Sequence, residues 1–473
     1  MNLRSCFGAP WPDVDVTDLV EHTGEVEPGC AFFAVADDRR VAAQHAIQAR
    51  ALGAQVIASQ HDLEDAVQIA DLDAVRGQLA ARFYEAPASS MECIAVTGTN
   101  GKTSVAWFIA GLSEALGVAC GYIGTLGFGR VQEIELGEMT TPNPVACQRL
   151  LAQLRNQGCR RVVMEVSSHA LDQGRVATVP YRAAVFTNLS RDHLDYHGSM
   201  EAYGAAKQLL FTDFPIVTAV LNVADAYSQS IAAATQARVI YFGREADDCQ
   251  WRWRQDGEQV VWQCPTGEYR ANPRMAADFA LDNLTAALAV LLSAGDEMSH
   301  DAAEELFAAV NAVPQVPGRM EVIDVDQAHG TVVVDYAHTP DALAKALAAL
   351  RSGCRGQLIC VVGCGGDRDR GKRPQMAEAA VKQADQVWFT SDNPRTEAPE
   401  QILADMTAEL SADARHIHIN VDRRAAIKAA LMGAEEQDVV LIAGKGHENY
   451  QEVAGQKLPF DDRLVARSVL AEI

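Results

Sequence analysis

Long apolar runs are missing from this sequence of 473 residues. No stretch approaches the roughly 18 consecutive apolar residues of a transmembrane helix. The first residues, Met-Asn-Leu-Arg-Ser-Cys, carry no apolar signal core. We therefore expect a cytoplasmic protein without stable membrane association.

Positive charge is also scarce. Lys and Arg number 40 against 63 Asp and Glu, which gives a net charge of −23. This balance disfavours nonspecific binding to nucleic acids and acidic membranes, although a local basic pocket can still bind an anionic ligand. We expect a monomer that acts on small molecules and has no nucleic-acid partner.

Closely spaced cysteine pairs are absent as well. None of the 11 cysteines forms a Cys-x-x-Cys pair, and Cys360 and Cys364 have no second pair that would complete a zinc site. Most of them are expected to be small buried side chains in a reducing compartment. Internal repeats and low-complexity segments are also missing, and the hydrophobic fraction of 48% is sufficient for globular cores.

A glycine loop between a predicted strand and a predicted helix is the most informative stretch present. The apolar run 93–96 predicts a buried strand, and 104–116 predicts an amphipathic helix that ends at Gly117. Between them, Thr97-Gly-Thr-Asn-Gly lets backbone N–H groups face an anion at the helix N-terminus. Lys102 is placed for the outer phosphates and the Thr103 hydroxyl for Mg²⁺. Although the loop is two residues shorter than the usual one, it predicts a nucleoside-triphosphate site.

The length favours three domains of ordinary size. Apolar runs alternate with helical stretches, a pattern typical of parallel sheets covered on both faces. Residues 239–242 and 251–262 resemble an added antiparallel piece, and 85–90 a linker. The predicted fold class is α/β, with a small N-terminal α/β module at 1–88, a central P-loop-type parallel-sheet ATPase domain at 89–317 and a Rossmann-like C-terminal domain at 318–473.

Polar clusters follow several predicted strands, where ligands of open parallel sheets bind. In the central domain, Glu165 and His193 are candidate Mg²⁺ ligands. The His193/His197 spacing invites a zinc interpretation, but the surroundings are rich in oxygen and lack the Glu of a zinc protease.

The predicted C-terminal domain has a comparable concentration of charge. Residues 363–374 place four cations in a glycine loop, Ser391-Asp-Asn-Pro-Arg395 presents an arginine after the next strand, and Glu448 offers an anion for an ammonium group. Because arginine grips a carboxylate at two points, these groups together suit a zwitterionic ligand.

The motifs, in this order, resemble those of the ATP-dependent Mur ligases over nearly the whole chain. The Thr97–Ser104 loop is the motif that the family shares, and the other motifs narrow the resemblance to the branch that adds meso-diaminopimelate. These other motifs are Thr140-Thr141-Pro142, Glu165 to Leu171, Asn188 to Asp195, Tyr203 to Phe211, Asp335 to His338 and Gly444 to Glu448.

The resemblance implies an activity. The D-Glu carboxylate of UDP-N-acetylmuramoyl-L-Ala-D-Glu would attack the γ-phosphate of ATP, and the amine of meso-diaminopimelate would then attack the acyl phosphate. An amide, ADP and phosphate would result, as a step of peptidoglycan precursor synthesis.

The resemblance also implies ATP and Mg²⁺ as cofactors, and it assigns residues to them. Lys207, which the residue pattern alone would leave on a helix surface, matches a lysine that relatives carbamylate with CO₂. The implied catalytic residues are Lys102, Glu165, His193 and Lys207, and the implied metal ligands are Thr103, Glu165, His193 and Lys207. The implied ATP contacts are Gly98, Thr99, Asn100, Gly101, Lys102, Thr103, Ser104, Asn283, Arg319 and Asp335.

Two further sets of residues are implied for the substrates. The set for the UDP-muramyl dipeptide is Thr23, Thr140, Thr141, Ser167, Gln173 and Arg175. The set for meso-diaminopimelate is Arg368, Asp392, Asn393, Pro394, Arg395, Gly444 and Glu448, in which Arg395 favours diaminopimelate over lysine because the distal carboxylate needs a cation.

The predicted first domain departs from the family pattern. His22-Thr23-Gly24 stands where relatives carry Asp-Ser-Arg, the later segment is shortened to 36–40, and Met139 stands where an asparagine is common. Two alternatives therefore stay open. One is a Mur-type ligase that joins an amino acid to a different acidic acceptor, and the other is a non-catalytic protein that binds ATP or a muropeptide.

Overall fold

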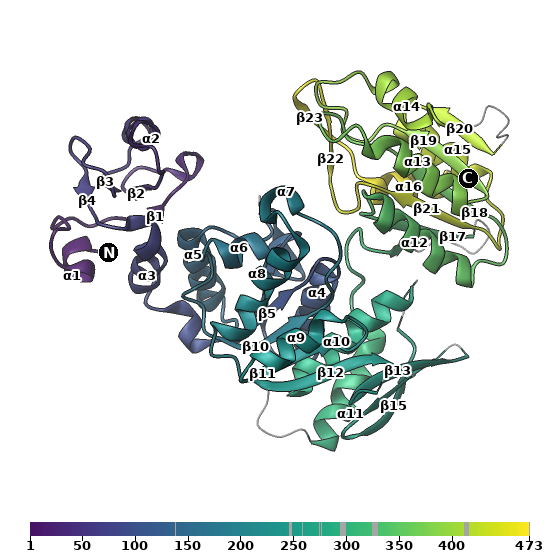
Figure 1. Cartoon of the computed structure of the whole chain (residues 1–473), viewed down its shortest axis with the longest axis horizontal. Coiled ribbons are helices and arrows are strands. Elements are labelled where there is room, and N and C mark those ends of the chain that lie inside the picture. Colours follow the sequence, from purple (N-terminus) through teal and green to yellow (C-terminus); the bar gives the residue numbers. More distant parts are fainter. Residues whose placement is uncertain are drawn as a thin grey trace. The chain divides into compact units, whose positions relative to one another are not determined.

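The computed structural model describes residues 1–137, 139–245, 248–257, 259–273, 275, 277–293, 299–323, 330–410 and 416–472. They group into two compact units, which we describe separately. Unit 1 holds Met1–Ala271 and Asn283–Val313, and unit 2 holds Asn272–Asp282 and Pro314–Ile473. Figure 1 colours the chain from purple at the N-terminus to yellow at the C-terminus. Within the described ranges, none of the helices has the length and apolar character needed to cross a membrane.

Unit 1 begins with a small α/β module. Its elements are α1 (Leu3–Phe7), β1 (Leu19–Val20), the 3-10 helix η1 (Thr23–Glu25), β2 (Ala31–Ala34), α2 (Arg39–Ala51), β3 (Val56–Ser59), β4 (Val67–Gln68) and α3 (Leu72–Phe83). The four strands are parallel, in the order β1-β2-β3-β4. Alternate residues of β2 face opposite sides: Phe33 packs with α1 and α3, and Phe32 packs with α2.

The rest of unit 1 is built on a second, larger sheet. Its elements are η2 (Pro87–Ser90), β5 (Glu92–Thr97), α4 (Lys102–Ala115), β6 (Cys120–Gly124), β7 (Gly127–Arg130), β8 (Glu133–Glu135), α5 (Pro144–Asn156), β9 (Arg161–Glu165), α6 (Ser168–Asp172), β10 (Tyr181–Phe186), α7 (Leu194–His197), α8 (Met200–Thr212), β11 (Thr218–Asn222), α9 (Tyr227–Ala234), β12 (Arg238–Arg244), β13 (Trp251–Asp256), β14 (Gln259–Cys264), β15 (Gly267–Ala271), α10 (Asp278–Ser293), α11 (His300–Ala309) and η3 (Val310–Ala312).

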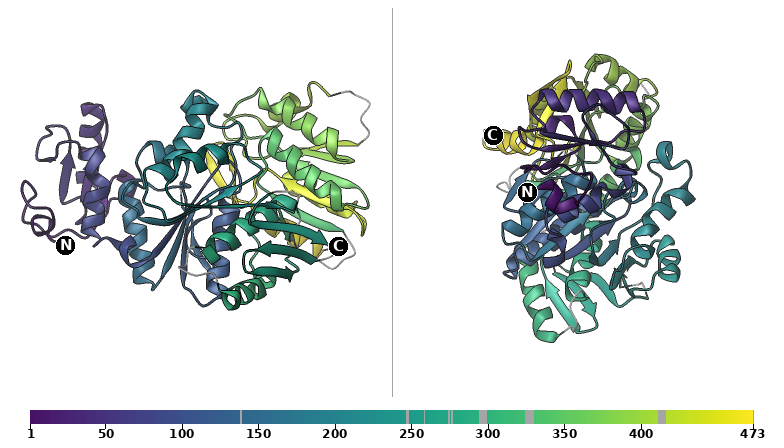
Figure 2. Two further views of the ribbon diagram at one scale, coloured as in Figure 1. Left: turned by 60° about the horizontal axis from the view of Figure 1, so that its bottom comes forward. Right: turned by 90° about the vertical axis from the view of Figure 1, so that its left-hand side faces the viewer.

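This larger sheet has eleven strands in the order β15-β14-β13-β12-β11-β10-β5-β9-β6-β7-β8. The stretch from β13 to β6 is parallel, and antiparallel strands extend it at both edges. Helices α5, α6, α8 and α9 bury apolar residues against one face. Figure 2 shows the strands and helices of this unit from two further sides. The parallel-sheet core was predicted and is confirmed.

One prediction for unit 1 is wrong in detail. Residues 239–242 lie in β12, which pairs in parallel with both β11 and β13, so the antiparallel piece starts only at the β13–β14 pair. The segment 85–90, predicted as a linker, contains η2, and its Ala88 joins Met91 in the buried core, a packing that the sequence did not indicate. In both places, packing against neighbouring elements decides the structure, and a single stretch of sequence does not contain that information.

Unit 2 contains a six-stranded sheet. Its elements are β16 (Glu321–Ile323), β17 (Thr331–Asp335), α12 (Pro340–Gly353), β18 (Leu358–Val362), α13 (Lys372–Gln383), β19 (Gln386–Thr390), α14 (Pro399–Thr407), β20 (Ile417–Asn420), α15 (Arg423–Met432), β21 (Val439–Ala443), β22 (Tyr450–Val453), β23 (Gln456–Pro459) and α16 (Asp462–Leu470). The sheet order is β16-β17-β21-β18-β19-β20, parallel except for the β16 edge.

Helices cover both faces of this sheet, as predicted. Val333, Cys360 and Leu441 point to the core shared with α12, α13 and α14, and their neighbours along the strands point to the core shared with α15 and α16. Figure 1 shows α12 and α13 beside the strands of this sheet. The antiparallel β22–β23 hairpin, which the sequence pattern did not indicate, is a separate two-stranded sheet.

Candidate functional site

The glycine loop joins β5 to α4, at the predicted boundary. Gly98 and Gly101 have φ values of +146° and +87°, which favour glycine. A Cβ at Gly98 would lie 1.9 Å from the Thr187 hydroxyl oxygen, and one at Gly101 would lie 2.5 Å from Asn283 Oδ1. The loop therefore needs glycine at both positions, and the side chain of Asn283, one of the implied ATP contacts, lies against Gly101.

Residues after β10 brace this loop. The Thr187 hydroxyl donates to the Asn100 carbonyl at 2.5 Å, and Asn188 both donates to that carbonyl and accepts from the Asn100 N–H, each at 3.0 Å. The Thr99 N–H donates to the Asn188 carbonyl at 2.8 Å. Neutral hydrogen bonds thus fix the loop backbone.

Two lysine ammonium groups converge on the same loop carbonyl. Lys102 Nζ and Lys207 Nζ lie 3.0 and 2.9 Å from the Gly98 oxygen. Lys207 is 1% exposed, so the prediction of a surface lysine from the residue pattern is wrong: α8 buries the face that carries Tyr203, Lys207 and Leu210. Burial, and then the neighbouring Lys102, hold the pKa of Lys207 well below its usual value.

The Glu165 carboxylate is fully buried at the end of β9. It accepts hydrogen bonds from the Thr103 hydroxyl at 3.0 Å, from the Tyr122 hydroxyl at 2.5 Å and from both the N–H and the hydroxyl of Thr125 at 2.9 and 3.1 Å. The structure therefore brings together Thr103 and Glu165, two of the implied metal ligands, beside the loop.

His193 lies elsewhere in the site. Its ring centroid is 4.9 Å from that of His169 and 6.0 Å from that of Tyr203, whose hydroxyl lies 3.2 Å from the Thr99 hydroxyl. Within the described residues, no hydrogen bond or ion pair joins His193 to Glu165, and no cluster of three or more His, Cys, Asp or Glu side chains could hold a metal. An oxygen pair such as Thr103 and Glu165 fits Mg²⁺, which keeps several waters and phosphate oxygens as ligands.

Five implied acceptor residues of unit 1 lie together. The Thr141 hydroxyl donates to the Glu165 carbonyl at 2.8 Å and accepts from the Ser167 N–H at 3.1 Å. The Thr140 hydroxyl lies 3.1 Å from that of Thr125. Arg175 Nη1 donates to the Thr141 carbonyl at 3.0 Å. These contacts connect the implied acceptor site to the Glu165 cluster.

Gln173 extends this network toward the segment that carries His193. Its Oε1 accepts from Arg175 Nε at 2.9 Å, and its Nε2 donates to the Tyr196 hydroxyl at 3.1 Å. The Tyr196 hydroxyl donates to Asp172 Oδ2 at 2.7 Å. The sequence analysis did not identify Tyr196 or Asp172, because only tertiary structure brings α7 beside α6.

Thr23, the remaining implied acceptor residue, begins η1 and makes no side-chain hydrogen bond to this network within the described residues. The side chain of its neighbour Glu21 is 7% exposed, and its Oε2 lies 2.9 Å from Arg76 Nε. Burial raises the pKa of Glu21 to about 7, although Arg76 and Arg175 oppose that rise. Glu21 and Arg76 were not predicted as site residues from the sequence.

In unit 2, charged and polar side chains cluster at the carboxyl ends of β19 and β21, in the implied amino-acid pocket. Asn393 Nδ2 donates to Glu448 Oε2 at 2.8 Å, and a Cβ at Gly444 would lie 2.6 Å from Asp392 Oδ2. Lys445 is completely buried and donates to Asn393 Oδ1 and Glu448 Oε2, both at 3.1 Å. Glu448, predicted as an anion for the ligand, thus already has a protein cation beside it.

The loop after β18 borders the same pocket. Arg395 Nη1 donates to the Gly366 carbonyl at 2.8 Å, and a Cβ at Gly366 would lie 2.0 Å from the Pro394 carbonyl oxygen. Arg368 is exposed, with its Cγ 3.7 Å from the Cβ position of Gly365. The structure therefore brings together all seven implied amino-acid contacts.

The two implied nucleotide contacts of unit 2 are also neighbours. The Asp335 carboxylate accepts from the N–H groups of Met320 and Ala337 at 2.7 and 2.8 Å, and the Arg319 guanidinium lies 4.2 Å from the Tyr336 ring centroid. Burial raises the pKa of Asp335, and Arg319 opposes this rise.

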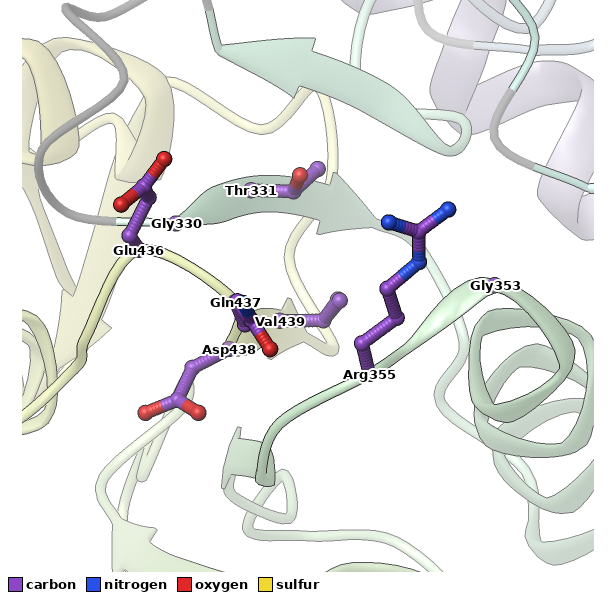
Figure 3. A pocket seen from close by; sticks show the side chains of 8 residues that line it. All are labelled: Gly330, Thr331, Gly353, Arg355, Glu436, Gln437, Asp438 and Val439. Carbon is purple, nitrogen blue, oxygen red and sulfur yellow. The ribbon is translucent and has the colours of Figure 1, made fainter. Parts of the chain in front are cut away.

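A surface hollow of about 390 Å³ lies at the opposite end of the same sheet. Thr331 and Val439, the first residues of β17 and β21, line it together with Arg355. Figure 3 shows Arg355 and the side chains around it. None of the predicted site residues lines this hollow.

These features together define an α/β enzyme that uses a nucleotide: the glycine loop, the buried Glu165 beside it, and the charged residues at the ends of β19 and β21. The family model of the Mur ligase middle domain matches residues 96–291, and the model described as Mur ligase, glutamate ligase domain matches residues 318–446.

Individual relatives agree with the family models. The chain is 42% identical to UDP-N-acetylmuramoyl-L-alanyl-D-glutamate–2,6-diaminopimelate ligase of Coxiella burnetii, over 97% of this chain and 96% of that protein. It is 41% identical to the ligase of the same name from Pseudomonas aeruginosa, over 100% of this chain and 98% of that protein. The chain belongs to the Mur ligase family.

Solved structures show the same fold. A structure titled as that diaminopimelate ligase is 34% identical, with a TM-score of 0.71 and coverage of 100% of this chain and 99% of its own. The MurF ligase of Thermotoga maritima, solved in complex with ADP, shares the fold with a TM-score of 0.65 at 18% identity, and 98% of each chain is covered.

Proposed function

We propose that this protein is the ATP-dependent ligase that joins the amine of meso-diaminopimelate to the D-Glu carboxylate of UDP-N-acetylmuramoyl-L-Ala-D-Glu. The observation that carries this proposal is the 42% identity to a ligase of that name over nearly the full length of both chains. We further propose that it works in the cytoplasm as a monomer, with its domains bounded at residues 88 and 317.

The glycine loop is proposed to hold the phosphates of ATP. Its N–H groups and the Lys102 ammonium would neutralise charge that develops during phosphoryl transfer. Thr103 and Glu165 would hold Mg²⁺, which supplies further charge neutralisation at the phosphates when bound. Asn283, Arg319 and Asp335 would contact the rest of the nucleotide.

Lys207 is proposed to react with CO₂. A lysine amine must be neutral to attack CO₂, and burial, together with the neighbouring Lys102, lowers the pKa of Lys207 and so favours the neutral form. The resulting carbamate would place a negative charge next to the cationic Lys102 and the polar Tyr203. His193, close to Tyr203, would complete this side of the site.

The reaction is proposed to run in two steps. An oxygen of the acceptor carboxylate, held by Thr141 and Arg175, would attack the γ-phosphorus, and ADP would leave. The amine nitrogen of the amino acid would then attack the acyl carbon, lose a proton and expel phosphate. In the amino-acid pocket, Asn393 and Glu448 would orient the reacting end, and Arg395 would grip the distal carboxylate.

A second acceptor class is favoured by one observation in the first module. A buried glutamate follows β1, beside the His22-Thr23-Gly24 sequence that departs from the family pattern. When it is ionised, a carboxylate in this position adds negative charge where a pyrophosphate would need cations. The alternative is therefore a ligase of the same chemistry whose acidic acceptor lacks the uridine nucleotide.

The deciding experiment is phosphate release with ATP, Mg²⁺ and an amino acid. We expect release to require both UDP-N-acetylmuramoyl-L-Ala-D-Glu and meso-diaminopimelate, with lysine a poor replacement. Release with N-acetylmuramoyl-L-Ala-D-Glu but not with the uridine nucleotide would favour the second acceptor class. No ADP with any of these acceptors would contradict both ligase proposals and favour a binding protein.

A further inference from the structure

The β22–β23 hairpin packs along the loop that carries Arg395. The Arg395 N–H donates to the Glu452 carbonyl at 2.9 Å, and the Ala454 N–H donates to the Arg395 carbonyl at 2.7 Å. Arg395 thereby forms a parallel bridge with Val453. Its φ of +53° is unfavourable for a residue other than glycine, so these hydrogen bonds stabilise a conformation that the loop would otherwise avoid.

The hairpin also holds two earlier residues of this loop, Asp392 and Asn393. Gln451 Nε2 donates to the Asp392 carbonyl at 2.7 Å, and the Glu452 N–H donates to Asn393 Oδ1 at 2.9 Å. Asn393 in turn contacts Glu448 and Lys445. A single strand of the hairpin therefore touches three of the implied amino-acid contacts.

The Arg395 guanidinium is held at two of its edges. Its Nη1 donates to the Gly366 carbonyl at 2.8 Å, and its Nε lies 3.4 Å from Glu452 Oε2. The Arg395 and Glu452 side chains are 21% and 27% exposed, so solvent only partly screens this pair. Because Glu452 approaches a single edge, it does not form the two-point grip that would exclude another carboxylate.

We propose that Glu452 is a positioning residue that orients Arg395 and so sets the preference of the pocket for an amino acid with a second carboxylate. The proposal rests on the proposed function. An arginine side chain that is already ordered loses less conformational entropy when it binds its ligand, and this increases affinity without a new contact to the ligand. Glu452 acts on binding of the amino acid and not on the chemistry at its amine.

The test compares Glu452→Ala, Glu452→Gln and Arg395→Ala with a matched hairpin control, Gln456→Ala, whose side chain is exposed on β23. For each variant, kcat and KM are measured with meso-diaminopimelate and with lysine, and a thermal melt reports folding. We expect Glu452→Ala to raise KM for diaminopimelate about fivefold, with kcat within twofold and lysine unaffected. Glu452→Gln keeps an acceptor for Nε and should recover most of the affinity.

A double variant completes the test. If Glu452 acts through Arg395, removing Glu452 in the Arg395→Ala background will leave KM unchanged. An unchanged or lower KM in Glu452→Ala would overturn the inference, as would an equal loss for lysine or an effect of Gln456→Ala of the same size. A wild-type protein that does not use diaminopimelate would instead overturn the proposed function.

Discussion

The glycine loop and the amino-acid pocket both lie at the carboxyl ends of parallel strands, but they are held in different ways. The loop is one contiguous segment whose backbone is fixed by neutral hydrogen bonds from Thr187 and Asn188. The pocket is assembled from separate segments held by charged side chains, such as Lys445, which donates to Asn393, and Arg423, which pairs with Asp462. A phosphate is recognised mainly by the backbone groups of one segment, which distant residues hold in place, whereas a zwitterion is recognised by side chains that come from several segments.

The largest expected effect is at the loop. Lys102→Ala should lower the rate of acceptor-dependent phosphate release about 10³-fold, because a preorganised cation near the transferring phosphate is lost. Because Lys102 also donates to the loop carbonyls of Gly98 and Thr99, a thermal melt of the variant shows whether the fold is preserved. Lys457→Ala is the matched control for loss of a lysine. Activity above one tenth of wild type would contradict the assigned role.

The next effect is on stability in unit 2. Arg423 and Asp462 are both fully buried, and Arg423 also donates to the carbonyls of Ser391 and Ala443 at the ends of two strands. Arg423→Ala should lower the free energy of unfolding by about 3–5 kcal/mol, because it leaves a buried carboxylate without a partner. Urea unfolding measures this loss. Adding Asp462→Ala should recover part of it, and a fully additive double variant would argue against the pair.

A smaller effect is expected in the first module. Because the folded-state pKa of Glu21 is raised from 4.5 to about 7, the folded state binds more protons, and stability falls as pH rises from about 4.5 to 7. Glu21→Gln should remove up to about 3 kcal/mol of this dependence, since one pKa unit corresponds to about 1.4 kcal/mol. Melting curves across this pH range provide the measurement. Parallel curves for the variant and the wild type would disprove the buried, protonated carboxyl.

The smallest expected effect is at the Glu165 cluster. Thr125→Val removes one neutral hydroxyl donor and keeps the backbone donor at the same position. We expect a loss of about 1 kcal/mol in stability and a modest rise in the Mg²⁺ concentration needed for half-maximal rate. A loss of stability as large as that of Arg423→Ala would show that neutral hydrogen bonds and charged pairs contribute equally to stability in this protein.

The structure agrees best with the sequence-based predictions where it is local. The β5–loop–α4 boundary, the strand ends at Glu165 and the doubly wound sheet of unit 2 follow from periodicity and glycine placement within short windows. The agreement is weakest where two distant segments meet. The parallel pairing of β12 and the packed helix at 87–90 depend on neighbours that are remote in sequence, and the β22–β23 hairpin matters only because it contacts the Arg395 loop.

Lys207 illustrates this division most clearly. The sequence by itself determined a phosphate loop, because glycine torsion angles and a helix N-terminus are properties of a few adjacent residues. Only the tertiary structure placed Lys207 against the loop and removed it from water, and only the tertiary structure ordered Arg395 beside Glu452. Burial and charge pairing are sums over residues that the fold brings together, so they are decided by packing and not by any one segment.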